Sequence, residues 1–133
     1  MPVEFVNPPE LGAPIGMYSH TAVAKGSEIV VIAGQVGLSS DGKLSGPDIY
    51  SQTLQAFRNI EAAVTASRCT MRDVMRFQTF IVGADNIAEF MRARGEVFPR
   101  FYPDGAYPPN TLLVVSRLVQ PELLVEIEAM AVH

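Results

Sequence analysis

Two glutamates near the carboxy terminus have a spacing that suits chemistry on one surface. Glu126 and Glu128 stand two residues apart in the run Leu-Leu-Val-Glu-Ile-Glu-Ala-Met, so on a β-strand both side chains point to the same face. One interpretation is an acidic strip that faces water. The other is that a partly buried carboxylate positions a water molecule and removes its proton, as a general base does. The spacing alone leaves both interpretations open.

Arg94 occupies an unusual place for a charged residue. Apolar residues recur at three- and four-residue steps between residues 86 and 98, which predicts a helix with one apolar stripe. The stripe consists of Ile87, Phe90, Met91 and Phe98. Arg94 falls on this stripe, where an unpaired charge is costly. Its guanidinium therefore reaches water at the rim, pairs with a carboxylate such as that of Glu126, or holds an anionic ligand.

Tyr18, His20 and Cys69 are the remaining candidates for reactive side chains. Tyr18 and His20 share one face of a predicted strand, and His20 is either a packing and hydrogen-bonding residue or a group that exchanges protons near neutral pH. Cys69 has no histidine placed to activate it, which predicts an idle thiol. The other histidine, His133, ends the sequence, so no pair has zinc-ligand spacing, and there is no glycine-rich phosphate loop. We expect neither a metal nor a cofactor.

The elements that position these residues follow from the hydrophobic periodicity. Strands are predicted at residues 18–23, 28–36, 76–82, 111–118 and 123–132, and helices at 48–67, with Asp48 as N-cap, and at 86–98. Residues 1–16 are rich in proline and glycine and are predicted to be an irregular lead-in, and residues 102–109 form a stiff proline loop. The order ββαβαββ predicts an α+β fold in a single domain over residues 1–133.

Several predicted strands are apolar on both faces. In residues 111–118, Leu113 and Val115 lie on one face and Leu112 and Val114 on the other. Strands of this kind are buried on both sides. Two helices, each about 10 Å across, cover only one face of such a sheet, so we expect another copy of the chain to cover the second face.

The composition excludes some classes of partner. The chain is 48% hydrophobic and 18% charged, with a formal net charge of −4 and scattered basic residues, which argues against an electrostatic nucleic-acid binder. It has one cysteine, no apolar run long enough to span a bilayer, and no signal-peptide pattern at its start. We therefore expect a cytoplasmic protein that binds neither nucleic acid nor membrane.

Four segments carry a resemblance to a known family. They are IGMYS at 15–19, IAGQVGLSSDGKL at 32–44, QTLQAFRNI at 52–60 and LLVEIEAMAV at 123–132. Over these segments, in order, the chain resembles the RidA/YjgF family. The resemblance implies a chorismate-mutase-like α+β fold with a mixed sheet and two helices on one face. It also implies a homotrimer whose sheets form a central barrel, with ligand clefts between subunits.

The resemblance also bears on chemistry. The best-known branch of the family hydrolyses enamines and imines, such as those derived from 2-aminoacrylate, without cofactor or metal, and the family also carries the label endoribonuclease L-PSP. The pocket positions that match the family are Tyr18, Gly34 and Glu126, the last being the glutamate that orients water. At five positions this chain differs from the family. Asn110 stands where the family has the arginine that binds the substrate carboxylate, and Arg94 stands where it has asparagine. Ala33 replaces serine or threonine, Leu112 replaces cysteine, and His20 stands where glutamine is common.

These matches and departures lead to two hypotheses. The first is a cofactor-free hydrolase or deaminase of a small imine or enamine other than 2-aminoacrylate, with Glu126 handling water and Tyr18, Arg94 and Asn110 holding the substrate. Arg94 would supply the cation that Asn110 does not provide. The alternative is a non-catalytic trimer that binds a small molecule, or acts as a regulatory protein, through the same clefts. The acidic charge and the absence of a histidine pair argue against a ribonuclease.

Overall fold

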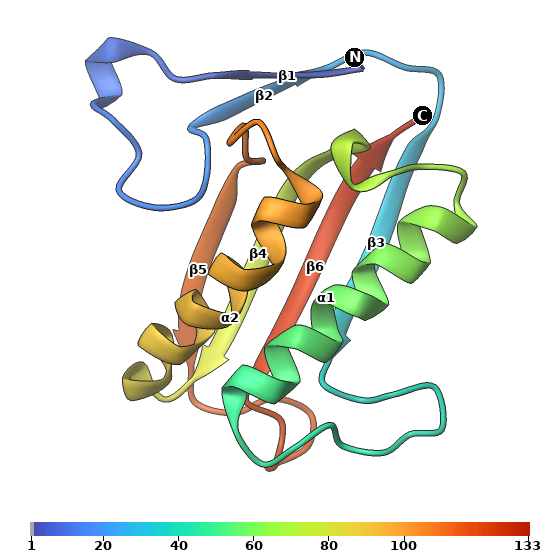
Figure 1. Cartoon of the computed structure of the whole chain (residues 1–133), viewed down its shortest axis with the longest axis vertical. Coiled ribbons are helices and arrows are strands. Elements are labelled where there is room, and N and C mark those ends of the chain that lie inside the picture. The colour runs from blue at the N-terminus through green and yellow to red at the C-terminus, as the bar shows by residue number, and fades with distance from the viewer. Residues whose placement is uncertain (1) are drawn as a thin grey trace.

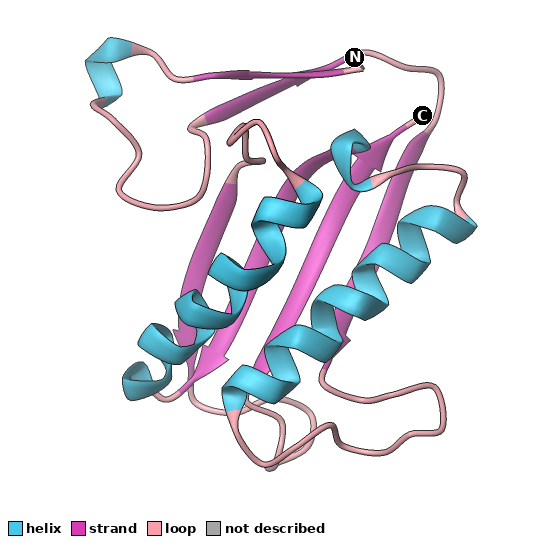
Figure 2. Ribbon diagram, viewed as in Figure 1, coloured by secondary structure: helices cyan, strands magenta, loops and turns pink. Residues whose placement is uncertain are grey.

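A four-stranded mixed sheet forms the centre of the fold, in a computed structural model that describes residues 2–133 (Figure 1). The strand order is β3 (Ile29–Val36), β6 (Val125–Val132), β4 (Val74–Val82) and β5 (Asn110–Val115). Only β4 and β5 run parallel, and the other two pairs are antiparallel. Helices α1 (Ile49–Ala66) and α2 (Ile87–Phe101) lie side by side across one face of this sheet (Figure 2). The prediction of a mixed sheet with two helices on one face is confirmed.

Helix α1 begins at the predicted N-cap. The Asp48 carboxylate accepts a hydrogen bond of 2.9 Å from the backbone N–H of Ser51, which satisfies one of the donors that the first turn leaves unpaired. On the same helix Gln52 is fully buried, donating to the carbonyls of Gly46 and Glu122 and accepting from the N–H of Leu124. Gln52 thereby ties the start of α1 to the chain just before β6, the strand that carries Glu126.

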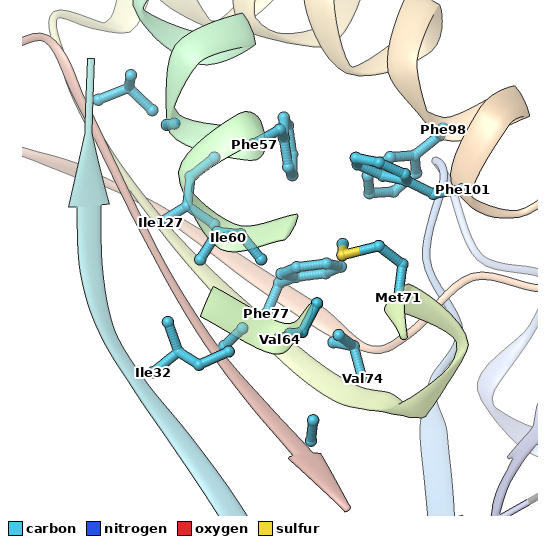
Figure 3. Close-up of a cluster of buried hydrophobic side chains, with 14 of the residues drawn as sticks. Ile32, Phe57, Ile60, Val64, Met71, Val74, Phe77, Phe98, Phe101 and Ile127 are labelled. Atoms are coloured by element: carbon cyan, nitrogen blue, oxygen red, sulfur yellow. The ribbon is translucent and has the colours of Figure 1, made fainter. Parts of the chain in front are cut away.

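Aromatic side chains fill the space between the helices and the sheet (Figure 3). Phe57 of α1 lies at the centre, with ring centroids 5.9 Å from Phe77 of β4 and 5.4 Å from Phe98 of α2. Burying each such ring contributes about 1.5–3 kcal/mol of stability. Every second residue of β6 completes the same core: Val125, Ile127, Ala129 and Ala131 are all 3% exposed or less.

The opposite face of the sheet is uncovered in one chain. Ile29 and Val31 of β3 are 68% and 73% exposed, and Leu113 of β5 is 43% exposed. Glu126 and Glu128 belong to this open face, because they alternate with the buried residues of β6. An apolar open face of this kind fits the expected covering by another copy, which stays a prediction.

Three predictions about the first residues and the element ends were wrong. Residues 1–16 contain a strand, β1 (Val3–Val6), which pairs antiparallel with β2 (Thr21–Ala24) in a separate two-stranded ribbon, so the order is βββαβαββ. Only four residues long and paired with a distant segment, β1 leaves little periodic signal. Strand β2 also begins after residues 18–20, so Tyr18 and His20 lie in the preceding loop and not on a strand. The further strand residues predicted at 116–118 lie outside β5, which ends at Val115.

The remaining differences are small. Helix α2 continues to Phe101 in spite of Pro99, because Phe98 and Phe101 pack in the core on either side of the proline. Short 3₁₀ turns at Pro9–Leu11, Met71–Asp73 and Ala84–Asn86 complete the chain. Within residues 2–133, neither helix has the length and apolar character needed to cross a lipid bilayer.

Candidate functional site

A pocket of about 330 Å³ opens where α2, the outer strand β5 and the loop before β2 meet. It is lined by Ile15, Gly16, Tyr18, Met91, Arg94, Asn110, Thr111 and Leu112. Four of the residues singled out from the sequence, Tyr18, Arg94, Asn110 and Leu112, therefore lie around one cavity. The pocket wraps the edge of β5, because Asn110 and Leu112 face the helices while Thr111 between them faces the open side.

The Arg94 side chain is buried, and its charge is not neutralised. The residue is 4% exposed, with its guanidinium carbon 5.3 Å and 5.8 Å from the ring centroids of Phe90 and Phe98. Its Nε atom is buried without a hydrogen-bond partner, and no carboxylate of residues 2–133 lies within ion-pair distance of the guanidinium. Burial lowers the pKa of Arg94, against a smaller opposing influence of Tyr107, yet a guanidinium keeps its proton at neutral pH.

This burial decides between the interpretations of Arg94 within one chain. The guanidinium does not extend into water at a rim, and it does not pair with Glu126, which points to the opposite face of the sheet. Its Nη2 atom lies against Gly16, 3.6 Å from the place where a Cβ atom would stand. A buried cation whose N–H groups face a cavity without an acidic side chain is suited to an anion.

Asn110 is held in a fixed orientation at the same cavity. Its Oδ1 atom accepts a 2.9 Å hydrogen bond from the hydroxyl of Thr79, which is 1% exposed. With the oxygen engaged, the Nδ2 group of Asn110 is the part of the amide that remains to donate. Sequence reasoning overlooked Thr79, although a hydroxyl residue between Phe77 and Ile81, in the middle of an apolar strand, was a signal that could have found it.

Tyr18 lines the pocket, whereas His20 supports the loop from behind. The Tyr18 hydroxyl accepts a 3.4 Å hydrogen bond from the backbone N–H of Ile15. The His20 ring meets the Tyr18 ring edge-on at 5.8 Å, and its Nε2 atom lies 2.9 Å from the carbonyl oxygen of Gly12. In this structure His20 is a packing and hydrogen-bonding residue that holds residues 12–18 in place.

Ala33, Gly34 and Glu126 form a second group on the open face. A β-bulge between Ile32 and Gln35 places Ala33 and Gly34 beside β6. The Glu126 carboxylate lies over Gly34 so closely that a Cβ atom there would collide with it. Glycine is therefore required at this position for Glu126 to keep its place. Within one chain the sheet separates this group from Arg94 and Asn110.

The lone cysteine lies outside both groups. Cys69 is buried beside the end of β6, and burial raises the pKa of its thiol, which fits the predicted idle role. Among the residues that the structure describes, no three histidine, cysteine or acidic side chains gather as a metal site would require.

Comparisons with known proteins agree with this architecture. The family model described as endoribonuclease L-PSP matches residues 10–133. A 2-iminobutanoate/2-iminopropanoate deaminase of Dermatophagoides farinae is 32% identical over 133 residues, covering 98% of this chain and 97% of that protein. The Rid-family protein YyfB of Yersinia pestis, a protein of unknown function, has a TM-score of 0.90 at 29% identity, with both chains covered completely. TdcF of Escherichia coli, solved with bound serine, has a TM-score of 0.72 at 26% identity, covering 90% of this chain and 91% of that one.

The structural agreement confirms the chorismate-mutase-like fold that the resemblance implied. The matches with the family model and with the mentioned deaminase extend over nearly all of the sequence. The chain therefore belongs to the endoribonuclease L-PSP family, the family of the RidA and YjgF proteins.

Proposed function

We propose that this protein binds a small carboxylate at Arg94 and hydrolyses a 2-imino or enamine acid, in clefts between the subunits of a homotrimer and with no cofactor. The observation that carries the proposal is the buried guanidinium of Arg94, whose Nε has no partner among residues 2–133. An unpaired buried charge is costly, so a protein that keeps one gains from a ligand of opposite charge.

The other pocket residues favour an acid with a hydrocarbon body. The oxygen of Asn110 accepts from Thr79, so Asn110 can donate from Nδ2 at the pocket that Arg94 also lines. Met91 and Leu112 add apolar surface on the same wall. The names of two similar proteins point to the same class, because 2-iminobutanoate and serine each carry a carboxylate.

A second copy of the chain would complete the site. The pocket opens around the edge of β5, and the open face of the sheet carries exposed Ile29 and Val31 that need a cover. If the open face of one copy packs near the β5 edge of the next, its Glu126 approaches the pocket from the side opposite Arg94. Fixed against Gly34, that carboxylate could then act on a water molecule.

The reaction needs only side chains from two neighbouring copies of this protein and one water molecule. Arg94 and Asn110 hold the carboxylate of R–C(=NH)–COO⁻, and Glu126 accepts a proton from water as the water oxygen attacks the imine carbon. Glu126 returns this proton to the imine nitrogen, which gives a carbinolamine. The hydroxyl proton of the carbinolamine then passes to its amino group as the carbon–nitrogen bond breaks and the carbonyl forms. The products are ammonia and the 2-oxo acid, which balances the water consumed.

The substrate should differ from 2-aminoacrylate. The resemblance implies an arginine at the first residue of β5, and this chain has Asn110 there, so the cation lies on α2 instead. A carboxylate drawn toward α2 takes a different place in the cleft, and apolar surface from Met91 adjoins it. We expect faster hydrolysis of imino acids with a larger apolar side chain.

The test generates imino acids in place with an L-amino-acid oxidase, from leucine and from alanine, and follows release of ammonia. Wild-type protein should accelerate hydrolysis of the leucine-derived imine, while Glu126→Gln should bind the acid but lose at least about a hundredfold in rate. Arg94→Met should lose binding. Equal rates for the wild type and Glu126→Gln would refute the catalytic role.

A non-catalytic binding protein is the second candidate. It is favoured by one observation: within one chain Glu126 faces away from the pocket that holds Arg94. Tight binding of 2-oxo acids together with no acceleration of any imine tested would support this candidate.

A further inference from the structure

We propose that Thr79 is a positioning residue, which turns the amide of Asn110 so that Asn110 and Arg94 donate to the same anion. This inference rests on the proposed binding of a carboxylate at Arg94. It concerns a residue that does not line the main pocket and that acts through Asn110.

Thr79 places a hydroxyl group among buried apolar side chains, where it is hydrogen-bonded to Asn110. It lies on the helix-facing side of β4 between Phe77 and Ile81, which are 2% and 0% exposed, and is itself 1% exposed. A valine would fill nearly the same space without a polar atom. Among residues 2–133, the partner of the Thr79 hydroxyl is Asn110 Oδ1, at 2.9 Å. A buried hydroxyl is costly unless it is hydrogen-bonded, so removing either residue leaves the polar group of the other without this partner.

The orientation of the amide matters because Arg94 is adjacent. Asn110 and Arg94 line the same cavity, yet no hydrogen bond joins them in the described chain. If the amide were reversed, its oxygen would be the atom left free at the cavity that Arg94 also lines, where an acceptor competes with an anionic ligand for the N–H groups of Arg94. Engaging Oδ1 with Thr79 keeps the acceptor away from Arg94 and leaves Nδ2 to donate. The same cavity then offers a cation and a donor, which suits the two oxygens of a carboxylate.

The register between β4 and β5 determines that Thr79 and Asn110 are neighbours. In the parallel ladder Asn110 lies opposite Phe77, and Thr79 lies opposite Leu112, so Thr79 and Asn110 are diagonal neighbours on one face. Diagonal neighbours on adjacent strands lie within reach of each other's side chains. The contact therefore depends on the backbone of the sheet, not on a mobile loop.

The experiment measures binding of 2-oxobutanoate, a stable acid, by calorimetry to the wild type, Thr79→Val, Thr79→Ser, Asn110→Ala and the Thr79→Val/Asn110→Ala double variant. We expect Thr79→Val to bind about tenfold more weakly, since the energy of one oriented hydrogen bond is lost. Thr79→Ser keeps the hydroxyl and should bind as the wild type does. In the Asn110→Ala background, Thr79→Val should cause no further loss. Ile81→Val, which removes one methylene from a buried side chain of the same strand, is the control and should leave affinity unchanged.

Several results would overturn the inference. Wild-type affinity in Thr79→Val, equal losses in Thr79→Val and Thr79→Ser, or additive losses in the double variant would each do so. Relaxation of the Asn110 side-chain NH₂ group in ¹⁵N NMR gives a readout without ligand, because the amide should become mobile in Thr79→Val and stay rigid in Ile81→Val. No binding by the wild type would refute the proposed function as well, whereas binding lost in Arg94→Met but kept in Thr79→Val would refute this inference alone.

Discussion

Replacing Arg94 with methionine should make the ligand-free protein more stable. A guanidinium buried without a carboxylate costs several kcal/mol, and a methionine of similar length packs in the same space at no such cost. The substitution also removes the contacts of the guanidinium with Phe90 and Phe98, at 5.3 Å and 5.8 Å, which are worth about 1 kcal/mol each. We expect a net gain of about 2 kcal/mol in the free energy of unfolding, or ~8 °C in Tm for a chain of this length.

Thermal unfolding with and without 2-oxobutanoate measures both the stability of the ligand-free protein and the stability that the ligand adds. The wild type should gain about 2.7 kcal/mol when the acid is present at a hundred times its Kd, and Arg94→Met should gain nothing. All samples need the same protein concentration, because an oligomer's stability depends on it. The matched control is Arg92→Met, since Arg92 is exposed on the same helix and pairs with Glu89 at 2.7 Å and with Glu96 at 3.5 Å. Losing these exposed ion pairs should change the stability little and leave binding unchanged.

The opposite result would be decisive. Arg94→Met could instead lower the free energy of unfolding by about 2 kcal/mol or more. The guanidinium would then be paired in the assembled protein. The obvious partner is a carboxylate from another copy, and Arg94 would then be a structural ion pair and not a ligand-binding residue.

Three further results are expected. Val31→Asp places a charge on the open face of the sheet, where Val31 is 73% exposed in one chain, and should convert the protein to monomers in light scattering; an unchanged mass would argue that this face is not covered. Gly34→Ala should displace Glu126, lowering the rate of imine hydrolysis about tenfold to a hundredfold while 2-oxobutanoate affinity stays within about threefold; an unchanged rate would count against Glu126. Asp48→Ala should cost about 1 kcal/mol at pH 7, by loss of the α1 cap. Backbone and side-chain hydrogen bonds from Ser51 lower the pKa of folded Asp48, so the stability that Asp48 contributes is present above its unfolded-state pKa and disappears as the pH falls through its folded-state pKa. The stability curves of the variant and the wild type should therefore converge in acid, and a constant difference between them would contradict this.

Elements with a long periodic pattern could be predicted from the sequence. Helix α1 runs from its Asp48 cap as expected, and the closing strand lies within one or two residues of its predicted bounds. Strand β1 could not be predicted, because four residues between prolines carry no reliable period and their partner lies far along the chain. Helix α2 continues past Pro99 to Phe101, three residues beyond the predicted end at residue 98, since packing of the last turn outweighs the missing N–H.

The candidate site was predicted in part, and for a physical reason. A charge on an apolar helix stripe marks Arg94 from sequence alone, because burying charge is expensive and therefore informative. The contact between Thr79 and Asn110 depends on the register of two strands, which no local pattern specifies. Glu126 and Arg94 are separated by the sheet because Glu126 alternates with the buried residues of β6 and so lies on the face opposite α2.

A crystal structure of the protein grown with 2-oxobutanoate would test the central idea most directly. We expect the acid's carboxylate within hydrogen-bonding distance of the Arg94 guanidinium and Asn110 Nδ2, with Glu126 of a neighbouring copy facing the same cavity. An Arg94 paired with a protein carboxylate, or an open sheet face in contact with water alone, would contradict it.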